Sequence, residues 1–279
     1  MTMMKKMCVI ALLCLFAGQL YAQKINVGTY NLRYYSTNDG EHSWGERGEQ
    51  VKAQIRYHDF DIFGTQEGHK EQLDDIASLP NYAYIGLSRE GKGVKGEHSA
   101  IVYRTDKFKL LDHGDFWLSK TPEKASMGWD AHYKRICSWG LFEQKSNHKQ
   151  FYFFNVHLDN AGEIARVEGA KLMLKKIKKI NKKHLPQFLT GDFNMTADHE
   201  SIGLVKKQFL DAHDHCQTPR FGPEGTYNAF DVNFGWRRID FIFVSKEIPV
   251  LKYGVLSYIQ KKPRFASDHF PVLIQTTLD

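Results

Sequence analysis

The sequence has few cysteines, few prolines and no long apolar run in its interior. Four cysteines among 279 residues exclude a small disulfide scaffold, and 8 prolines with 22 glycines leave no room for long linkers. Beyond residue 22, no stretch is long and apolar enough to cross a bilayer. With 42% hydrophobic and 25% charged residues, the chain is predicted to fold, and disordered and collagen-like classes are excluded.

The first 22 residues have the pattern of a signal peptide. Lys5 and Lys6 precede an uncharged apolar run over residues 9–17, and the small residue Ala22 precedes Gln23. This order predicts cleavage after residue 22 and export to the periplasm or the exterior. The alternative is an N-terminal membrane anchor, which is disfavoured because the apolar run is short for a membrane span.

Residues 23–279 are expected to form one monomeric domain with no stable membrane insertion. They contain no repeat or low-complexity tract, and a domain of this size can bury a large core. Two cysteines remain after residue 22. An exported chain could form a disulfide between them, but two buried free thiols, Cys137 and Cys216, are the preferred expectation.

Short runs rich in β-branched and aromatic residues predict strands. They cover residues 25–30, 62–65, 83–87, 99–104, 151–157, 188–191, 239–245 and 270–276. Apolar residues at helical spacing predict helices over 47–58, 68–79 and 162–184. This mixed order of elements fits two packed sheets with helices outside them.

Three patterns in the chain have a functional and a structural interpretation. Seven lysines on the helix predicted at 162–184 fit either a patch for nucleic acid or anionic membranes or, preferably, a solvated helix face. Residues 91–96 (GKGVKG) have the spacing of a dinucleotide site, but a strand follows them, which predicts a glycine-rich hairpin loop. Residues 213–216 (HDHC) match no standard zinc spacing, so a loop is preferred.

Polar residues stand at the ends of several predicted strands. Such residues can converge on one rim of a sandwich while the strands hold them rigidly. Oxygen ligands without cysteine suit Mg²⁺, Mn²⁺ or Ca²⁺, and with histidines they fit phosphoester hydrolysis. The set contains four acids, two amides and two histidines: Glu67, Asp192, Asp240, Asp268, Asn31, Asn194, His157 and His269.

Six segments in this order resemble the endonuclease/exonuclease/phosphatase superfamily of DNase I-like proteins, particularly its exported bacterial and deadenylase-like branches. They are TYNLR, GTQEG, NVHLDN, GDFN, RRIDFIFVS and SDHFPV, and the resemblance spans residues 25–276. It implies an α/β fold, a four-layer α/β/β/α sandwich of two mixed sheets flanked by helices. It also implies a hydrolase of phosphoester bonds that uses Mg²⁺ or Mn²⁺.

The resemblance implies a role for each residue around the metal. Glu67 corresponds to the principal metal ligand. Asn31 lies beside it, and Asp268 contacts the same ion. Asp192 corresponds to the residue that orients or activates the attacking water, and Asn194 holds a phosphate oxygen.

The resemblance also places two histidines at the phosphate. His269 is expected to stabilise the transition state, and His157 to face the phosphate near the leaving group. Asp240 is expected to hold one of these histidines through a charged hydrogen bond. Glu97 stands at the spacing of an acid that pairs with the last histidine in DNase I-like members.

Residues that could select the substrate are predicted less specifically. Arg135 fits a phosphate clamp or a structural ion pair, and Arg237 and Arg238 are equally ambiguous. Aromatic rings could stack on bases or sugars or fill the core. The aromatic and amide candidates are Trp44, Trp129, Tyr227, Asn228 and Trp236.

Three hypotheses for the function follow. The first is an exported, metal-dependent phosphodiesterase of the nuclease kind, acting on nucleic acid or a small phosphodiester. The second is a phosphomonoesterase or a hydrolase of phospholipid head groups. The third, of another class, is a non-catalytic binding module on the same fold, which the complete set of acids and histidines disfavours.

Overall fold

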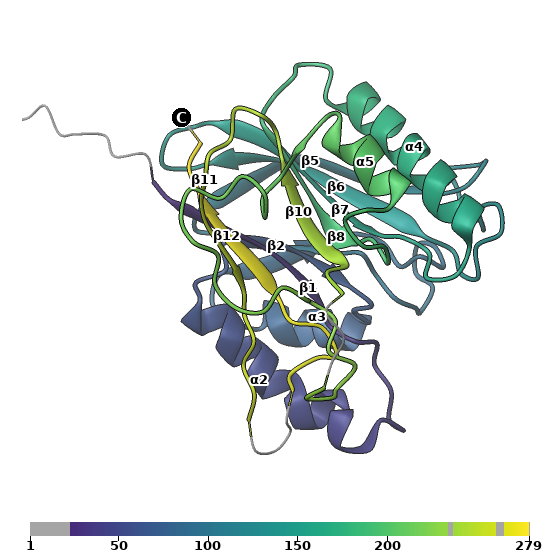
Figure 1. The fold of residues 1–279 in the computed structure, drawn as a ribbon, viewed down its shortest axis with the longest axis vertical. Helices are drawn as coiled ribbons and strands as arrows, with labels where there is room; N and C mark the ends of the chain where they lie inside the picture. Colours follow the sequence, from purple (N-terminus) through teal and green to yellow (C-terminus); the bar gives the residue numbers. More distant parts are fainter. Residues whose placement is uncertain (1–22, 234–236, 261–264, 279) are drawn as a thin grey trace, which may run out of the picture.

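The computed structural model describes residues 23–233, 237–260 and 265–278. Two six-stranded mixed sheets pack face to face, and helices cover the outer face of each (Figure 1). The predicted four-layer α/β/β/α sandwich is therefore confirmed. Residues 1–22, the expected signal peptide, lie outside the described residues.

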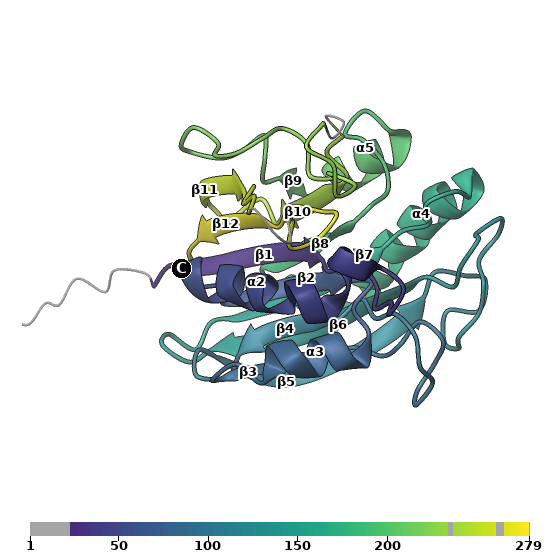
Figure 2. The same cartoon turned by 90° about the horizontal axis from the view of Figure 1, so that it is seen from below.

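The first sheet has the order β11-β12-β1-β2-β4-β3, in which only β1 and β2 are parallel. Helices α2 (Trp44–Tyr57) and α3 (Lys70–Ala77) cover its outer face, as Figure 2 shows, and a short 3₁₀ helix, η1 (Gly40–His42), precedes α2. The strands are β1 (Ile25–Asn31), β2 (Ile62–Gln66), β3 (Tyr82–Ile85), β4 (Ile101–Arg104), β11 (Val250–Val255) and β12 (Val272–Thr276).

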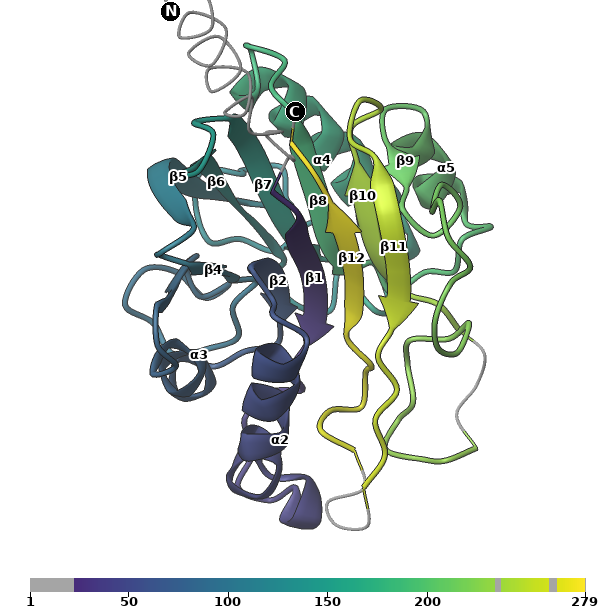
Figure 3. The same cartoon turned by 90° about the vertical axis from the view of Figure 1, so that its left-hand side faces the viewer.

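The second sheet has the order β5-β6-β7-β8-β10-β9, in which only β7 and β8 are parallel. Helices α4 (Glu163–Ile180) and α5 (Glu200–Lys206) lie on its outer face, behind the strands in Figure 3. The strands are β5 (Phe108–Trp117), β6 (Ile136–Gln144), β7 (Gln150–His157), β8 (Gln187–Asp192), β9 (Leu210–Asp211) and β10 (Asp240–Val244).

The core between the sheets is apolar along most of its length and polar near the ends of β2 and β7. Buried residues such as Val27, Phe153 and Phe188 fill the apolar part. At Gly64, a Cβ would lie 2.1 Å from Asn155 Oδ1, so glycine lets the two sheets approach closely. This close approach brings the ends of both sheets to one rim.

Every predicted helix and strand is present, with shifted boundaries, but the sequence patterns did not reveal β5, β6, β9, β11 and α5. β5 is an edge strand with an irregular register between Leu110 and Asp112 and several exposed polar residues. Edge strands of this kind lack the clean alternation of a half-buried strand. Among the described residues, no helix is long and apolar enough to span a membrane.

The three patterns that had both a functional and a structural interpretation match the structural one in each case. The lysines of α4 lie mostly on its exposed side, opposite buried Met173 and Ile177. Residues 91–96 form the predicted loop, and residues 213–215 lie in a turn after β9. Both cysteines are free thiols, but only Cys137 is buried. The expectation of burial for Cys216 is wrong, because this residue, which follows the turn and forms a β-bridge with Val250 of the edge strand β11, is partly exposed.

Candidate active site

The strand register brings three predicted site residues into one row. His157, the last residue of β7, pairs with Asp192, the last residue of β8. Asp192 in turn pairs with Asp240, the first residue of β10. Because the apolar residues of these strands fix the register, these three side chains are held at one end of the second sheet.

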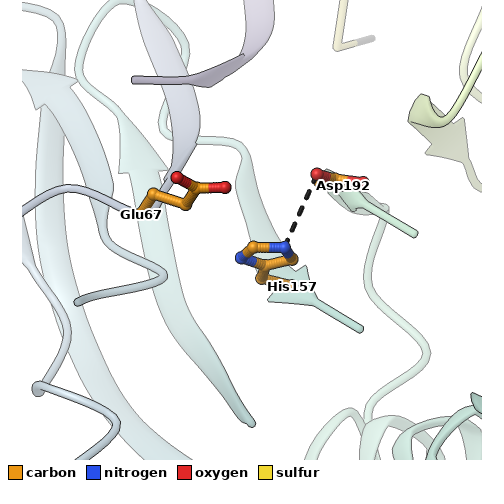
Figure 4. A group of neighbouring side chains, drawn as sticks. All are labelled: Glu67, His157 and Asp192. Atoms are coloured by element: carbon orange, nitrogen blue, oxygen red, sulfur yellow. Dashed lines mark ion pairs between the residues drawn. The ribbon is translucent and has the colours of Figure 1, made fainter. Parts of the chain in front are cut away.

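Residues from both sheets converge on this row. Glu67 follows β2, and its carboxylate lies near His157 and Asp192 (Figure 4), with one ligand atom of each residue within 4.8 Å of the others. Asp192, Asp240 and His269 form a second such group. The predicted acids and histidines therefore lie together at one end of the two sheets, at the bottom of a cleft. We call these six residues the floor: Glu67, His157, Asp192, Asp240, Asp268 and His269.

Asn31 connects the two sheets at the floor. Its Nδ2 donates to Glu67 Oε1 at 3.1 Å and to Asp192 Oδ2 at 3.0 Å, while its Oδ1 accepts from the backbone N–H of Arg33. The amide therefore presents its nitrogen to the carboxylates. The expected use of Asn31 as a metal ligand does not match this orientation, and the residue instead positions the two acids.

The buried acids make the floor suited to a cation. Burial, and then the neighbouring charge of Asp240, raise the pKa of Asp192 to about 7, although His269 opposes the shift. Burial also raises the pKa of Asp268, and the nearby charge of Glu67 adds to the rise. Desolvated carboxylates in excess are stabilised by a hard divalent cation, which prefers oxygen ligands. Glu67 and Asp192, whose carboxylate oxygens lie within 4.8 Å of one another, fit such an ion, whereas Asp268 lies in neither of the two groups.

The two histidines have opposite electrostatic environments. Burial lowers the pKa of His157 well below its ordinary value, and the charges of Arg135 and Arg89 lower it further. Burial acts the same way on His269, but Asp240, Asp192 and Asp268 outweigh it and hold its pKa well above the ordinary value. His269 is therefore the cationic imidazole of the floor and His157 the neutral one.

Asp240 makes the contact expected of it. Its Oδ2 lies 2.8 Å from His269 Nδ1, which fixes the ring and directs Nε2 toward Asp192, 3.8 Å away. Asn194 lies beside the other histidine: its Nδ2 is 3.0 Å from His157 Nε2 and donates to the backbone carbonyl of Leu158.

Glu97 does not pair with the last histidine, so that expectation is wrong. Asp240 takes that place, and Glu97 instead forms a two-pronged ion pair with Arg89, with N–O distances of 2.7 Å. Burial raises the pKa of Glu97 to about 7, although Arg89 opposes the rise. Glu97 still lines the cleft above the floor.

The floor opens into a cleft of about 450 Å³. Its walls combine arginines with tyrosines. The guanidinium of Arg33 lies 4.1 Å from the ring centre of Tyr34, that of Arg89 4.8 Å from Tyr133, and that of Arg237 5.1 Å from Tyr227. Four arginines line this cleft: Arg33, Arg89, Arg135 and Arg237. A cationic wall above an acidic floor suits an anionic substrate that meets a bound cation.

Arg135 combines both predicted interpretations. Its side chain is 5% exposed; Nε donates to Asp159 Oδ2 at 3.1 Å, and Nη2 donates to Asn160 Oδ1 at 3.0 Å. Nη1 is buried and has no hydrogen-bond partner within the described residues. The ion pair therefore holds a guanidinium whose third nitrogen is buried and unsatisfied within the described residues.

Other substrate candidates divide between the cleft and the core. Tyr227 lines the cleft with its ring centre 5.0 Å from that of His269. Asn228 is fully buried: Nδ2 donates to Ser267 O, and Oδ1 accepts from the N–H of Phe230. Its expected contact with substrate is wrong, because backbone groups occupy both ends of the amide.

The remaining aromatic and arginine candidates are mostly structural. Trp44 is buried and donates to Asp75, and Trp129 is half-buried. Arg238 forms a buried two-pronged pair with Asp211, whereas Arg237 lines the cleft. Trp236 lies outside the described residues.

Sequence reasoning missed two cleft residues, Arg89 and Tyr133, and the buried residue Asp159 that supports them. Asp159 had no assigned role, although it stands in the NVHLDN segment two residues after His157. That spacing was the available signal. Arg89 and Tyr133 lie in irregular loops, where no sequence pattern indicated that they line the cleft.

Comparison with known proteins agrees with this geometry. Residues 28–269 match the endonuclease/exonuclease/phosphatase family, and the chain belongs to it. Its members hydrolyse phosphoester bonds and typically use a divalent metal, so this protein is a phosphoester hydrolase by family.

Three similar proteins illustrate the relationship. A mannosyl-6-phosphatase of Bacteroides thetaiotaomicron is 45% identical, with 91% of this chain and 100% of that chain covered and a TM-score of 0.86. A family protein of Bacteroides vulgatus is 33% identical, covering 92% and 100%, also with a TM-score of 0.86. A protein of Acanthamoeba polyphaga mimivirus is 29% identical over 183 residues, which make up 61% of this chain and 66% of the viral protein.

Proposed function

We propose that the protein is a metal-dependent phosphomonoesterase that removes phosphate from a sugar phosphate. The observation that carries the proposal is the cleft of about 450 Å³ with four arginines above a floor of acids and histidines. The similarity to a mannosyl-6-phosphatase along nearly the whole chain supports the choice of a monoester and a sugar. The proposal therefore prefers the second sequence-based hypothesis to a nuclease-like phosphodiesterase.

The charge of the cleft supports a monoester. A phosphomonoester carries nearly two negative charges at neutral pH, whereas a diester carries one. Guanidinium groups bind phosphate oxygens with planar, two-pronged geometry, and Arg33 and Arg237 of the cleft lining would contact the phosphate in this way. A pocket of this volume accommodates a small molecule such as a monosaccharide phosphate.

Each floor residue has a role in this proposal. Glu67, Asp268 and Asp192 would hold Mg²⁺ or Mn²⁺, which when bound polarises the phosphoryl oxygens. Asp192 would orient the attacking water and accept its proton. His269, held by Asp240, donates a hydrogen bond to a phosphoryl oxygen as negative charge develops there.

The other side of the reaction involves His157 and Asn194. Asn194 Nδ2 lies 3.0 Å from His157 Nε2 and donates to the carbonyl of Leu158, so Asn194 would act by holding the ring of His157 in place. Water adds to phosphorus as its proton passes to Asp192, the bond from phosphorus to the sugar oxygen breaks, and the leaving sugar oxygen takes a proton from solvent water while Asp192 returns its own to solvent. His157, on the side of Arg135 and Arg89, lies where the leaving group would depart.

A substrate panel tests the proposal. Sugar 6-phosphates, methyl phosphate, bis-p-nitrophenyl phosphate, DNA, RNA and sphingomyelin would be assayed with Mg²⁺, Mn²⁺ and Ca²⁺. We expect kcat/KM for a sugar monoester to exceed that for any diester by at least about 100-fold, because binding energy from the sugar is used in the transition state. Faster cleavage of a diester would favour the nuclease-like function, and no cleavage of any ester would favour a binding module.

We also propose that residues 1–22 direct export and are removed, and that the mature enzyme is a monomer. The order of Lys5, Lys6, the apolar run and Ala22 supports this. N-terminal sequencing of the protein from an exporting host should give Gln23 first, and light scattering should give one chain. An uncleaved product in the cytoplasm would contradict the proposed export, and a stable dimer would contradict the proposed monomer.

A further inference from the structure

We propose that one wall of the cleft binds the sugar ring of the substrate and thereby sets the specificity. This wall, called the Tyr133 wall, comprises Arg89, Glu97, Tyr133, Arg135 and Asn160, all of which line the cleft. The inference rests on the proposed function, because it assumes that the substrate has a sugar attached to the phosphate.

Tyr133 supplies an exposed aromatic surface among the polar side chains of its own wall. It is 49% exposed, and the guanidinium groups of Arg89 and Arg135 lie 4.8 and 5.5 Å from its ring centre. A tyrosine ring gives large contact area at little cost in conformational entropy. The C–H face of a pyranose ring is an apolar surface of matching size, which a ring held in this way can cover.

Planar polar groups surround this ring. Glu97 contributes carboxylate oxygens, Asn160 an amide and Arg135 a guanidinium, so donors and acceptors stand together as the hydroxyl groups of a sugar require. Arg135 Nη1 is buried without a partner within the described residues. A buried unsatisfied donor is costly, and a sugar hydroxyl or ring oxygen would satisfy it.

The Tyr133 wall is held rigidly by Asp159. This buried carboxylate accepts from the backbone N–H groups of His132 and Tyr133 at 3.3 and 3.4 Å and from Arg135 Nε at 3.1 Å. It also accepts from the N–H of Gly162, at the start of α4, at 2.8 Å. Asp159 thus fixes the Tyr133 segment to the second sheet, as a preorganised binding site requires.

The other arginines and tyrosines of the cleft lining, Arg33, Tyr34, Tyr227 and Arg237, form a second group, which we call the opposite wall and which would bind the phosphate. Arg33 lies 3.7 Å from Asp268 of the floor, and the Tyr227 ring centre lies 5.0 Å from that of His269. In contrast, Arg89 pairs with Glu97, and Arg135 pairs with Asp159 and Asn160. The side chains of the Tyr133 wall therefore bind one another and lie beside His157, on the side proposed for the leaving group, whereas Arg33 and Tyr227 lie beside Asp268 and His269. A phosphate at the floor leaves the Tyr133 wall for the sugar.

The test compares a sugar phosphate with a phosphate that lacks the sugar. The kcat/KM for mannose 6-phosphate divided by that for methyl phosphate gives a sugar preference. We expect Tyr133→Ala to lower this preference about tenfold, mainly through KM for the sugar phosphate, and Tyr133→Phe to retain most of it, because the ring supplies the contact.

Two control variants define the result. Tyr34→Ala, on the opposite wall, should lower kcat/KM for both substrates by similar factors and so preserve the preference. Tyr57→Ala, at an exposed tyrosine of α2 outside the cleft lining, should match the wild type on both substrates. A preference that survives in Tyr133→Ala, or that falls equally in Tyr34→Ala, would overturn the assignment of the Tyr133 wall.

A binding measurement separates this inference from the proposed function. Turnover of mannose 6-phosphate with an unaltered preference in Tyr133→Ala overturns the sugar site and leaves the phosphatase. Calorimetric binding of mannose 6-phosphate without turnover, with affinity lost in Tyr133→Ala, overturns the phosphatase and supports the sugar site. Neither binding nor turnover in the wild type overturns both.

Discussion

The floor and the walls of the cleft differ in how the chain builds them. The floor stands at strand ends, where register fixes His157 opposite Asp192 and Asp192 opposite Asp240, and all three are buried. The walls stand on loops and carry half-exposed rings such as Tyr133. Rigid strands position the reacting groups to within fractions of an ångström, whereas loops can vary without disturbing them.

This difference separates two kinds of substitution. A change in the floor should reduce turnover of every phosphoester, because each ester needs the same attack on phosphorus. A change in a wall should alter affinity or selection and leave the chemical step largely intact. The following predictions test that separation.

The largest effect is expected at Asp192. Asp192→Ala removes the carboxylate that orients the water, and kcat should fall about 1000-fold on monoesters and diesters alike. Steady-state kinetics on both ester classes measures this, with the thermal unfolding midpoint as a control for folding. A loss confined to one ester class would place Asp192 in substrate selection instead.

Glu67→Gln should have the next largest effect. The substitution keeps the shape but removes the charge of the expected principal metal ligand, so activity at low Mg²⁺ should fall about 100-fold and be partly restored by more Mg²⁺. Activity measured across a Mg²⁺ titration checks this. Wild-type activity at low Mg²⁺ would remove Glu67 from the metal site.

Arg47 joins α2 to the loops that follow β1 and precede β12, and it should affect stability more than selection. Its buried guanidinium donates to the carbonyls of Leu32 and Ala266 at 2.6 and 2.9 Å, and to that of Arg33 at 2.9 Å. Arg47→Ala leaves these buried acceptors unsatisfied, and the free energy of unfolding should fall by about 3 kcal/mol. Urea unfolding measures it; a loss below about 1 kcal/mol would show that water or rearrangement replaces the contacts.

The smallest effect is expected in the wall at Arg237. Arg237→Lys keeps the charge but removes the two-pronged geometry and the contact with the Tyr227 ring. KM for a phosphomonoester should rise by about tenfold or less, with kcat nearly constant. A fall in kcat as large as that of the Asp192 variant would erase the distinction between floor and wall.

The same distinction explains what the sequence could predict. His157 and Asp192 stand at the ends of apolar runs that predict strands, so it could be predicted from the strand pattern and the motifs that these two side chains lie close together. Glu97 and Asn228 were assigned wrongly, because loop residues choose partners through tertiary contacts: Arg89 for one, and the backbone of Ser267 and Phe230 for the other. Periodicity carries no information on such contacts.

The missed strands have a related cause. β5 lies at a sheet edge with several exposed residues and an irregular register, and β6 contains Gly140 among its apolar residues. Neither has the pattern of a half-buried strand. The Tyr133 segment lies between these two strands, so no sequence pattern indicated that Tyr133 lines the cleft, whereas Arg135 was predicted as a substrate-binding candidate and does line it.

The central claim is that the floor forms one metal-dependent centre for phosphoester hydrolysis. The most direct measurement is turnover of mannose 6-phosphate and methyl phosphate by wild-type protein after treatment with chelator and after addition of Mg²⁺ or Mn²⁺. The account predicts that chelation abolishes turnover and that either ion restores it. Full activity in chelator, or no activity on any phosphoester with either ion, would contradict it.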